Sequence, residues 1–93
     1  MALRLRIVGL VQGVGFRDYM VREAATQGVS GWVRNRRDGS VEVFAIGPTE
    51  ALDAIKAAAR RGPRAARVIR VDADPANAAD WPGEQGFRML PTV

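Results

Sequence analysis

Hydrophobic and polar residues alternate along several segments of the chain, and this alternation predicts β-strands. The first strand runs from Leu3 to Val11, and the next two cover residues 29–35 and 40–46. A side-chain period of two is typical of a strand with one buried face. Residues 67–73 are apolar and β-branched without clean alternation, so we expect there a strand with a bulge or with both faces buried.

Helical spacing replaces this alternation in two other segments. Apolar residues from Phe16 onward recur at helical intervals, and Gly28 stands where the C-terminal cap of that helix is expected. A second helix is expected between Gly47-Pro48-Thr49 and Gly62-Pro63, because proline suits the start of a helix and glycine its end. Two helices therefore lie among the predicted strands.

The order of these elements predicts the fold. Asp38-Gly39 is a hairpin signal between the second and third strands. Residues 74–85 are expected to form a loop and residues 86–90 a short fifth strand. The order β-α-β-β-α-β is that of a ferredoxin-like α+β sandwich, with an antiparallel sheet and two helices on one face. The length of 93 residues suits one such domain, 1–93.

The composition narrows the chemistry that the chain can perform. It contains no cysteine and no histidine, which excludes disulfide scaffolds, zinc fingers and nucleophiles activated by histidine. Because its carboxylates are scattered along the sequence, we expect no metal site. They include Asp18, Glu23, Asp38 and Glu42. Any chemistry must rest on carboxylates, arginine, amides, hydroxyls or the backbone.

The chain is basic overall, but its basic residues are not clustered in one segment. The chain carries 14 basic and 10 acidic residues, and all but one of the basic residues are arginines. They are spread from Arg4 to Arg88, so charge alone does not separate a solvated basic surface from a nucleic-acid footprint. The N-terminus has no long apolar segment with a cleavage site, and no stretch has the length of a membrane span. We expect a cytoplasmic protein with no membrane partner.

The connection between the first strand and the first helix is the strongest local signal for a binding site. It contains Gly13 and Gly15, which permit a tight turn, and the N–H groups at the start of a helix favour an anion. Arg17 follows, and its guanidinium can hold two phosphate oxygens. Nucleotide-binding glycine patterns do not match, because no lysine follows and Asp18 occupies the third glycine position. The segment fits a cradle for a small terminal phosphate, or a glycine-rich turn with a surface arginine.

Asn35, at the end of the second strand, is the second candidate. Its carboxamide can orient a water molecule if strand pairing brings it near the end of the first strand; asparagine is also a favoured turn residue. Such a site offers only charge neutralisation and water positioning, which suffice mainly for a substrate that carries its own good leaving group. A mixed carboxylic-phosphoric anhydride is such a substrate.

Three segments resemble the acylphosphatase family: Val11-Gln12-Gly13-Val14-Gly15-Phe16-Arg17, Gly31-Trp32-Val33-Arg34-Asn35 and Asp38-Gly39-Ser40-Val41-Glu42. With Gly47-Pro48 and Gly86-Phe87, the resemblance spans nearly the whole chain. The resemblance implies a hydrolase that converts small-molecule acyl phosphates to a carboxylate and inorganic phosphate, without metal or cofactor. It implies two catalytic residues: Arg17, which would bind the phosphoryl oxygens, and Asn35, which would position the attacking water. The water's proton would pass to the phosphate of the substrate.

The resemblance also implies a phosphate-binding loop. That loop consists of Gln12, Gly13, Val14, Gly15, Phe16 and Arg17, and inorganic phosphate or sulfate can occupy it. Asp18 is a departure from the family pattern, because it puts a carboxylate beside Arg17. A carboxylate facing the phosphate would weaken its binding.

Other functions share parts of this pattern. An RNA-binding module of the RRM type has the same element order, but its third strand carries aromatic residues that stack on bases. The third strand here has a single aromatic residue, Phe44, and the acidic Glu42, so we expect no nucleic-acid partner. The sequence also leaves a second alternative, a non-catalytic module that binds an anion without hydrolysing it. A domain of a carbamoyl-transferring hydrogenase-maturation protein is not expected, because no linker or zinc-finger sequence follows Val93. We expect a monomer.

Overall fold

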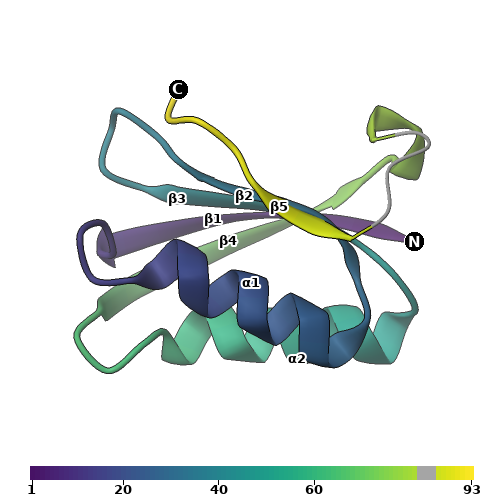
Figure 1. Cartoon of the computed structure of the whole chain (residues 1–93), viewed down its shortest axis with the longest axis horizontal. Helices are drawn as coiled ribbons and strands as arrows, with labels where there is room; N and C mark the ends of the chain where they lie inside the picture. The colour runs from purple at the N-terminus through teal and green to yellow at the C-terminus, as the bar shows by residue number, and fades with distance from the viewer. Residues whose placement is uncertain (82–85) are drawn as a thin grey trace.

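Two helices cover one face of a five-stranded sheet in the computed structural model, which describes residues 1–81 and 86–93 (Figure 1). The helices and strands are β1 (Ala2–Leu10), α1 (Phe16–Gln27), β2 (Ser30–Asn35), β3 (Val41–Ile46), α2 (Thr49–Arg61), β4 (Arg67–Ala76) and β5 (Phe87–Met89). A short 3-10 turn covers Ala78–Asp80. The strand order across the sheet is β4-β1-β3-β2-β5. The expected ferredoxin-like sandwich is confirmed, including its short fifth strand.

The sheet is mixed, which corrects the expectation of a wholly antiparallel one. The strands β1 to β4 pair antiparallel, but β5 runs parallel to β2, with Met89 opposite Val33. The reason is that β4 and β5 lie at opposite edges of the sheet. β4 ends opposite Ala2, at the end of the sheet where β2 begins, so β5 starts at that end on the opposite edge and runs in the same direction as β2.

β4 is longer than expected and lies at an edge. It continues to Ala76, where a loop was expected from residue 74, because Asp74 to Ala76 pair with the first residues of β1. The register shifts between Val8 and Gly9, so the expected bulge is confirmed. Burial of both faces is wrong, since Ile69 is 73% exposed. Residues 82–85 of the predicted loop lie outside the described residues.

The main core lies between the sheet and the helices. Strand alternation points Leu5, Ile7 and Val43 to the helices, where they pack against Phe16 and Ile55. Gly28 caps α1 with a φ of 67°, and its N–H donates to the last turn, as the sequence predicts. This packing fixes the ends of β1 and β2 beside the start of α1.

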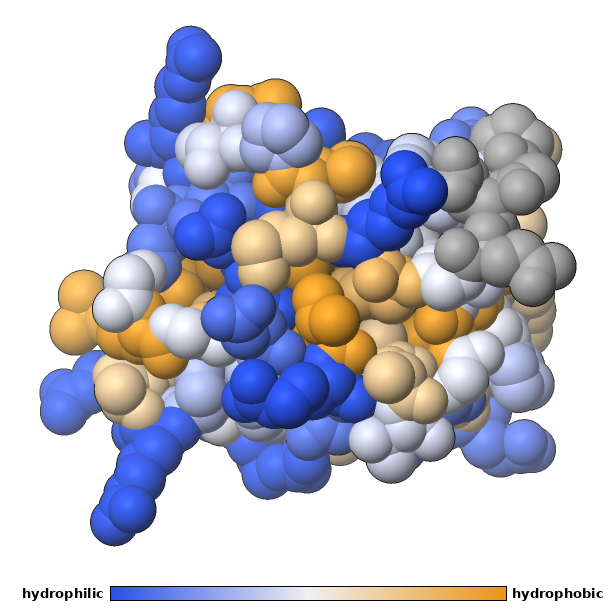
Figure 2. Space-filling view, viewed as in Figure 1, coloured by the Kyte–Doolittle hydropathy of each residue, from blue (hydrophilic) through white to orange (hydrophobic). Residues whose placement is uncertain are grey.

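A second apolar cluster lies on the outer face of the sheet. Trp32 and Phe44 stack with ring centroids 5.8 Å apart, and Ala2 and Trp81 pack against them. On the face seen in Figure 2, apolar residues form patches among hydrophilic ones. Among the described residues, no helix has the length and apolar character needed to cross a membrane.

Candidate active site

The loop between β1 and α1 exposes its backbone N–H groups. Gly13 and Gly15 have φ angles of 74° and 80°, a left-handed conformation that glycine adopts without strain. Gly15 is the N-cap of α1 and supplies no side chain to cap it. The N–H groups of residues 13–18 donate no hydrogen bond to any described residue. Unpaired N–H groups at a helix start form an anion-binding arrangement.

A small cavity of about 130 Å³ lies beside this loop. Its polar lining comes from the loop, the first turn of α1 and the end of β2, and its apolar lining includes one residue of β5. The lining residues are Val11, Gly13, Gly15, Phe16, Arg17, Asp18, Asn35 and Met89. The structure therefore brings Arg17 and Asn35 to one cavity, because pairing of β2 with β3, and of β3 with β1, places both strand ends at the same side of the sheet.

Neither of these two side chains is used elsewhere in the described part of the chain. The guanidinium of Arg17 has no ion pair or hydrogen bond there, and the carboxamide of Asn35 has no hydrogen bond. Both residues are partly buried. A guanidinium offers five N–H donors, and a carboxamide offers both donors and an acceptor. These groups are free to bind a ligand in the cavity.

Asp18 lies in the lining of the same cavity. Its carboxylate, at the first turn of α1, forms no ion pair with Arg17. A negative charge favours the positive end of the helix dipole, but in this position it also repels an anion bound in the cavity. The sequence left the orientation of Asp18 open, and the structure places this residue in the cavity lining.

Two residues of the sequence-predicted loop do not line the cavity. The side-chain Nε2 of Gln12 donates to the carbonyl oxygens of Arg36 at 2.6 Å and Ser40 at 2.9 Å, so it is committed to the β2–β3 hairpin. Val14 packs against the main core. From these positions, Gln12 and Val14 can serve a ligand only through the backbone.

The hairpin that follows Asn35 is held by a compact set of hydrogen bonds. The N–H of Arg36 donates to the carbonyl of Ser40 at 2.9 Å. The hydroxyl and N–H of Ser40 donate to the Asp38 carboxylate at 2.6 and 2.9 Å. The Ser40 hydroxyl, then its N–H and the Arg6 guanidinium, lower the pKa of Asp38 to about 2. The turn is therefore fixed directly next to Asn35.

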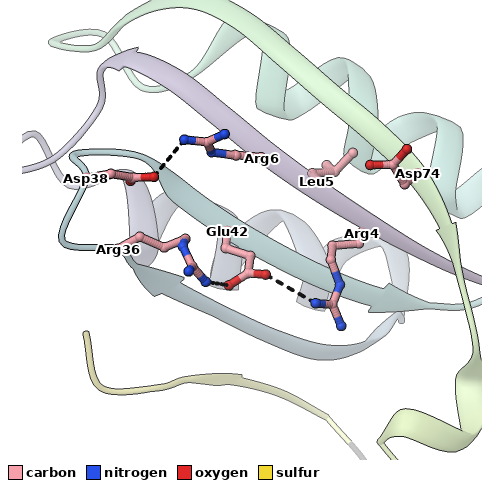
Figure 3. Close-up of a pocket in the computed structure, with 7 residues that line it drawn as sticks. All are labelled: Arg4, Leu5, Arg6, Arg36, Asp38, Glu42 and Asp74. Atoms are coloured by element: carbon pink, nitrogen blue, oxygen red, sulfur yellow. Dashed lines mark hydrogen bonds and ion pairs between the residues drawn. The ribbon is translucent and has the colours of Figure 1, made fainter. Parts of the chain in front are cut away.

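The outer face of the sheet holds a buried carboxylate among arginines (Figure 3). Glu42 accepts from Arg34 at 2.8 Å, Arg36 at 2.9 Å and Arg4 at 3.4 Å. Burial, the largest influence, raises the pKa of Glu42, but hydrogen bonds from Arg34 and Arg36 more than offset it, and the net shift is downward. The sequence reasoning missed this cluster, although the hairpin register places Arg34 directly opposite Glu42.

A second cavity of about 420 Å³ lies at this cluster. Figure 3 shows Arg6 directed at Asp38, and Arg36 and Arg4 directed at Glu42. Most of the charged side chains that line this larger cavity therefore form ion pairs with one another. The smaller cavity, whose polar side chains have no partners among the described residues, is the better candidate for an active site.

The two stacked aromatic rings of the outer face are covered and offer no platform for nucleic-acid bases. Trp32 and Phe44 are buried, and the guanidinium of Arg34 covers the Trp32 ring at 4.5 Å from its centroid. The Arg4 guanidinium lies over both rings. RNA-binding modules stack bases on exposed aromatic rings, and these two rings are not exposed.

The fold and this cavity define a class of small ferredoxin-like proteins with a loop of unpaired N–H groups before the first helix. Within that class, the chain belongs to the acylphosphatase family, since the family model described as Acylphosphatase matches residues 3–89. Its members are hydrolases, as the resemblance in the sequence indicated.

Individual relatives agree with this assignment. An acylphosphatase of Nitrobacter hamburgensis is 55% identical over 91 residues, which cover 94% of this chain and 91% of the relative. An acylphosphatase of Salinibacter ruber is 52% identical over 84 residues, covering 90% and 86%. The crystal structure of acylphosphatase from Bacillus subtilis superposes with a TM-score of 0.88 at 34% identity, covering 96% of this chain and 97% of that one.

Proposed function

We propose that this protein hydrolyses acyl phosphates to a carboxylate and inorganic phosphate, with water as the nucleophile. The observation that carries the proposal is the shared cavity of Arg17 and Asn35, two polar side chains without partners in the described chain, beside a loop of unpaired N–H groups. The function of the relatives supports the same reaction.

The loop and Arg17 hold the phosphoryl group in this proposal. In phosphoryl transfer, negative charge is spread over the three equatorial oxygens, so catalysis consists largely of positioning and electrostatic stabilisation. The N–H groups of residues 13–17 and the guanidinium of Arg17 supply donors for those oxygens. The helix dipole of α1 adds positive potential at the same end.

Asn35 orients the attacking water. Its carboxamide can accept from the water and donate to it or to a phosphoryl oxygen, and it faces the cavity from β2, opposite the loop that holds the phosphate. The proton passes to a phosphoryl oxygen of the substrate. The leaving group is a carboxylate with an ordinary pKa near 4, so it departs as an anion without a general acid.

A metal is not required for this chemistry. Arg17 and the N–H groups supply the charge stabilisation that a cation supplies elsewhere. Among the described residues, no group of three or more acidic side chains is arranged to hold a metal ion.

Hydrolysis of benzoyl phosphate, followed by ultraviolet absorbance, tests the proposal. We expect turnover by the wild-type protein, unaltered by excess chelator. Arg17→Ala is expected to lose about a hundredfold to a thousandfold in kcat/KM, the usual cost of a lost charge-stabilising donor. Arg22→Ala is the matched control, because Arg22 is an exposed arginine of α1 outside the cavity. No hydrolysis by the wild type, or equal activity in Arg17→Ala and Arg22→Ala, would contradict the proposal.

The protein is proposed to act as a monomer, which its length of 93 residues allows. Sedimentation velocity at the assay concentration tests this. The cytoplasmic location expected from the sequence stays a prediction, which fractionation of cells tests.

A further inference from the structure

Met89 is the exposed apolar residue of the candidate active site. Three apolar side chains line the cavity, and two of them, Val11 and Phe16, belong to the buried core. Met89 is 42% exposed. An apolar side chain left partly exposed at the mouth of a polar cavity offers contact surface that nothing within the described chain uses.

The pairing of β5 with β2 fixes this residue next to Asn35. Met89 lies opposite Val33, and the next N–H, of Leu90, donates to the Val33 carbonyl at 2.9 Å. Asn35 lies two residues further along β2, on the same face as Val33. Phe87, two residues before Met89, packs against the main core. Met89 therefore lies on the α1 side of the sheet, where the first turn of α1 and the end of β2 enclose the cavity.

The polar groups of the cavity define where the phosphoryl group lies. Arg17, Asn35 and the N–H groups of the loop gather in this small cavity of about 130 Å³, and in the proposed function they bind the phosphoryl group and the attacking water. The acyl part of the substrate then lies toward the rim, where the charged Asp18 and the apolar Met89 are both found.

We propose that Met89 is a specificity-determining residue that packs against the acyl group, so that the enzyme prefers acyl phosphates with an uncharged, apolar acyl group. This inference rests on the proposed function. Methionine suits the role, since its unbranched thioether adapts to differently shaped apolar groups and makes favourable contacts with aromatic rings. An acyl group with its own carboxylate is disfavoured at this rim, where Asp18 repels it.

The test compares benzoyl phosphate with acetyl phosphate, because the two share the phosphoryl end and differ in apolar surface. The measured quantity is the ratio of their kcat/KM values. In Met89→Gln, which keeps the side-chain length and removes the apolar end, we expect the ratio to fall about three- to tenfold, the range expected when roughly one methylene-sized apolar contact is lost. Met89→Leu is expected to keep the ratio within about twofold, since it is a volume-conserving apolar exchange.

The control is Ile69→Gln, which removes a more exposed apolar side chain from β4, outside the cavity. Circular dichroism and inhibition by inorganic phosphate show whether each variant keeps its fold and its loop. An unchanged ratio in Met89→Gln, or an equal fall in Ile69→Gln, would overturn the role of Met89. If the wild type hydrolysed neither substrate, the proposed function itself would fail, which is a distinct result.

Discussion

The side-chain Nε2 of Gln12 lies 2.6 Å from the carbonyl oxygen of Arg36, and this contact ties the β1–α1 loop to the residue that follows Asn35. The same nitrogen lies 2.9 Å from the carbonyl of Ser40. Both N–H groups of one amide are therefore used to hold the loop against the β2–β3 hairpin. The two halves of the candidate active site come from different elements, and Gln12 sets the spacing between them.

Gln12→Ala is expected to lower kcat about ten- to a hundredfold, because a misplacement of the order of 1 Å between reacting groups has effects of that size. The affinity for inorganic phosphate should fall less, since the backbone N–H groups of the loop remain. Steady-state kinetics with benzoyl phosphate and inhibition by phosphate separate the two effects. Gln27→Ala, at the exposed end of α1, is the control. Parallel losses of kcat and phosphate affinity would show that Gln12 acts only through the fold of the loop.

Asp18→Asn removes the negative charge from the cavity lining while keeping the size of the side chain. Because a carboxylate at this position repels a bound anion, we expect inorganic phosphate to bind about three- to tenfold more tightly, as a difference of about 1 kcal/mol implies. Competitive inhibition at low ionic strength measures this. The variant also tests a rival role for this carboxylate: a large fall in kcat would identify Asp18 as a proton acceptor and contradict transfer to the substrate.

Much of this site follows from the sequence, and the missing part has a physical reason. Arg17 and Asn35 stand at the ends of elements that local periodicity defines, and the pairing of β1, β3 and β2 brings those ends together. The partners of the Gln12 side chain depend on how the hairpin folds back against the loop, which no local pattern records. Met89 joins the cavity only because β5 pairs parallel to β2, and the periodicity of residues 86–90 does not show which strand this segment pairs with or in which direction.

The same distinction holds for the fold. Gly28 and Gly62-Pro63 mark the ends of the helices correctly, because capping is a local property. The extension of β4 to Ala76 depends on pairing with β1 at the other end of the sequence. A segment rich in alanine, aspartate and proline becomes a strand there because a neighbouring strand supplies its hydrogen-bond partners.

Substitutions at two glycines distinguish the cost of an unfavourable backbone conformation from the cost of a steric clash. A Cβ at Gly13 would meet nothing within 4 Å, whereas a Cβ at Gly31 would lie 1.8 Å from the carbonyl oxygen of Phe44. Gly13→Ala is therefore expected to cost about 1–2 kcal/mol of stability, the penalty for a left-handed backbone. Gly31→Ala forces β2 away from β3 and should cost more than about 3 kcal/mol. Urea unfolding measures both; equal costs would contradict this distinction.

The Glu42 cluster predicts a loss of stability in acid. The pKa of Glu42 is lowered in the folded protein, and that of Asp38 falls from 3.8 to about 2. A carboxylate with a lowered folded pKa contributes stability above its unfolded pKa and loses it as the pH falls through the folded value. We therefore expect the free energy of unfolding to decline between about pH 4.5 and pH 2, the range spanned by the ordinary and lowered pKa values.

Glu42→Gln should weaken this decline and cost about 1–3 kcal/mol at neutral pH, because it removes charge-assisted hydrogen bonds and leaves neighbouring guanidinium groups without their counter-charge. Asp53→Asn, an exposed position on α2, is the control and should follow the wild-type curve. Urea unfolding at a series of pH values gives the curves. Identical slopes for Glu42→Gln and the wild type would show that Glu42 does not carry the effect.

The most direct test of the account is calorimetric titration of inorganic phosphate into Asn35→Ala and Arg17→Ala, beside their kcat values for benzoyl phosphate. We expect Asn35→Ala to bind phosphate within about threefold of the wild type while its kcat falls about a hundredfold, as loss of an oriented nucleophile implies. Arg17→Ala should lose phosphate binding. Wild-type turnover in Asn35→Ala, or wild-type phosphate affinity in Arg17→Ala, would contradict the division of binding and water positioning between these two residues.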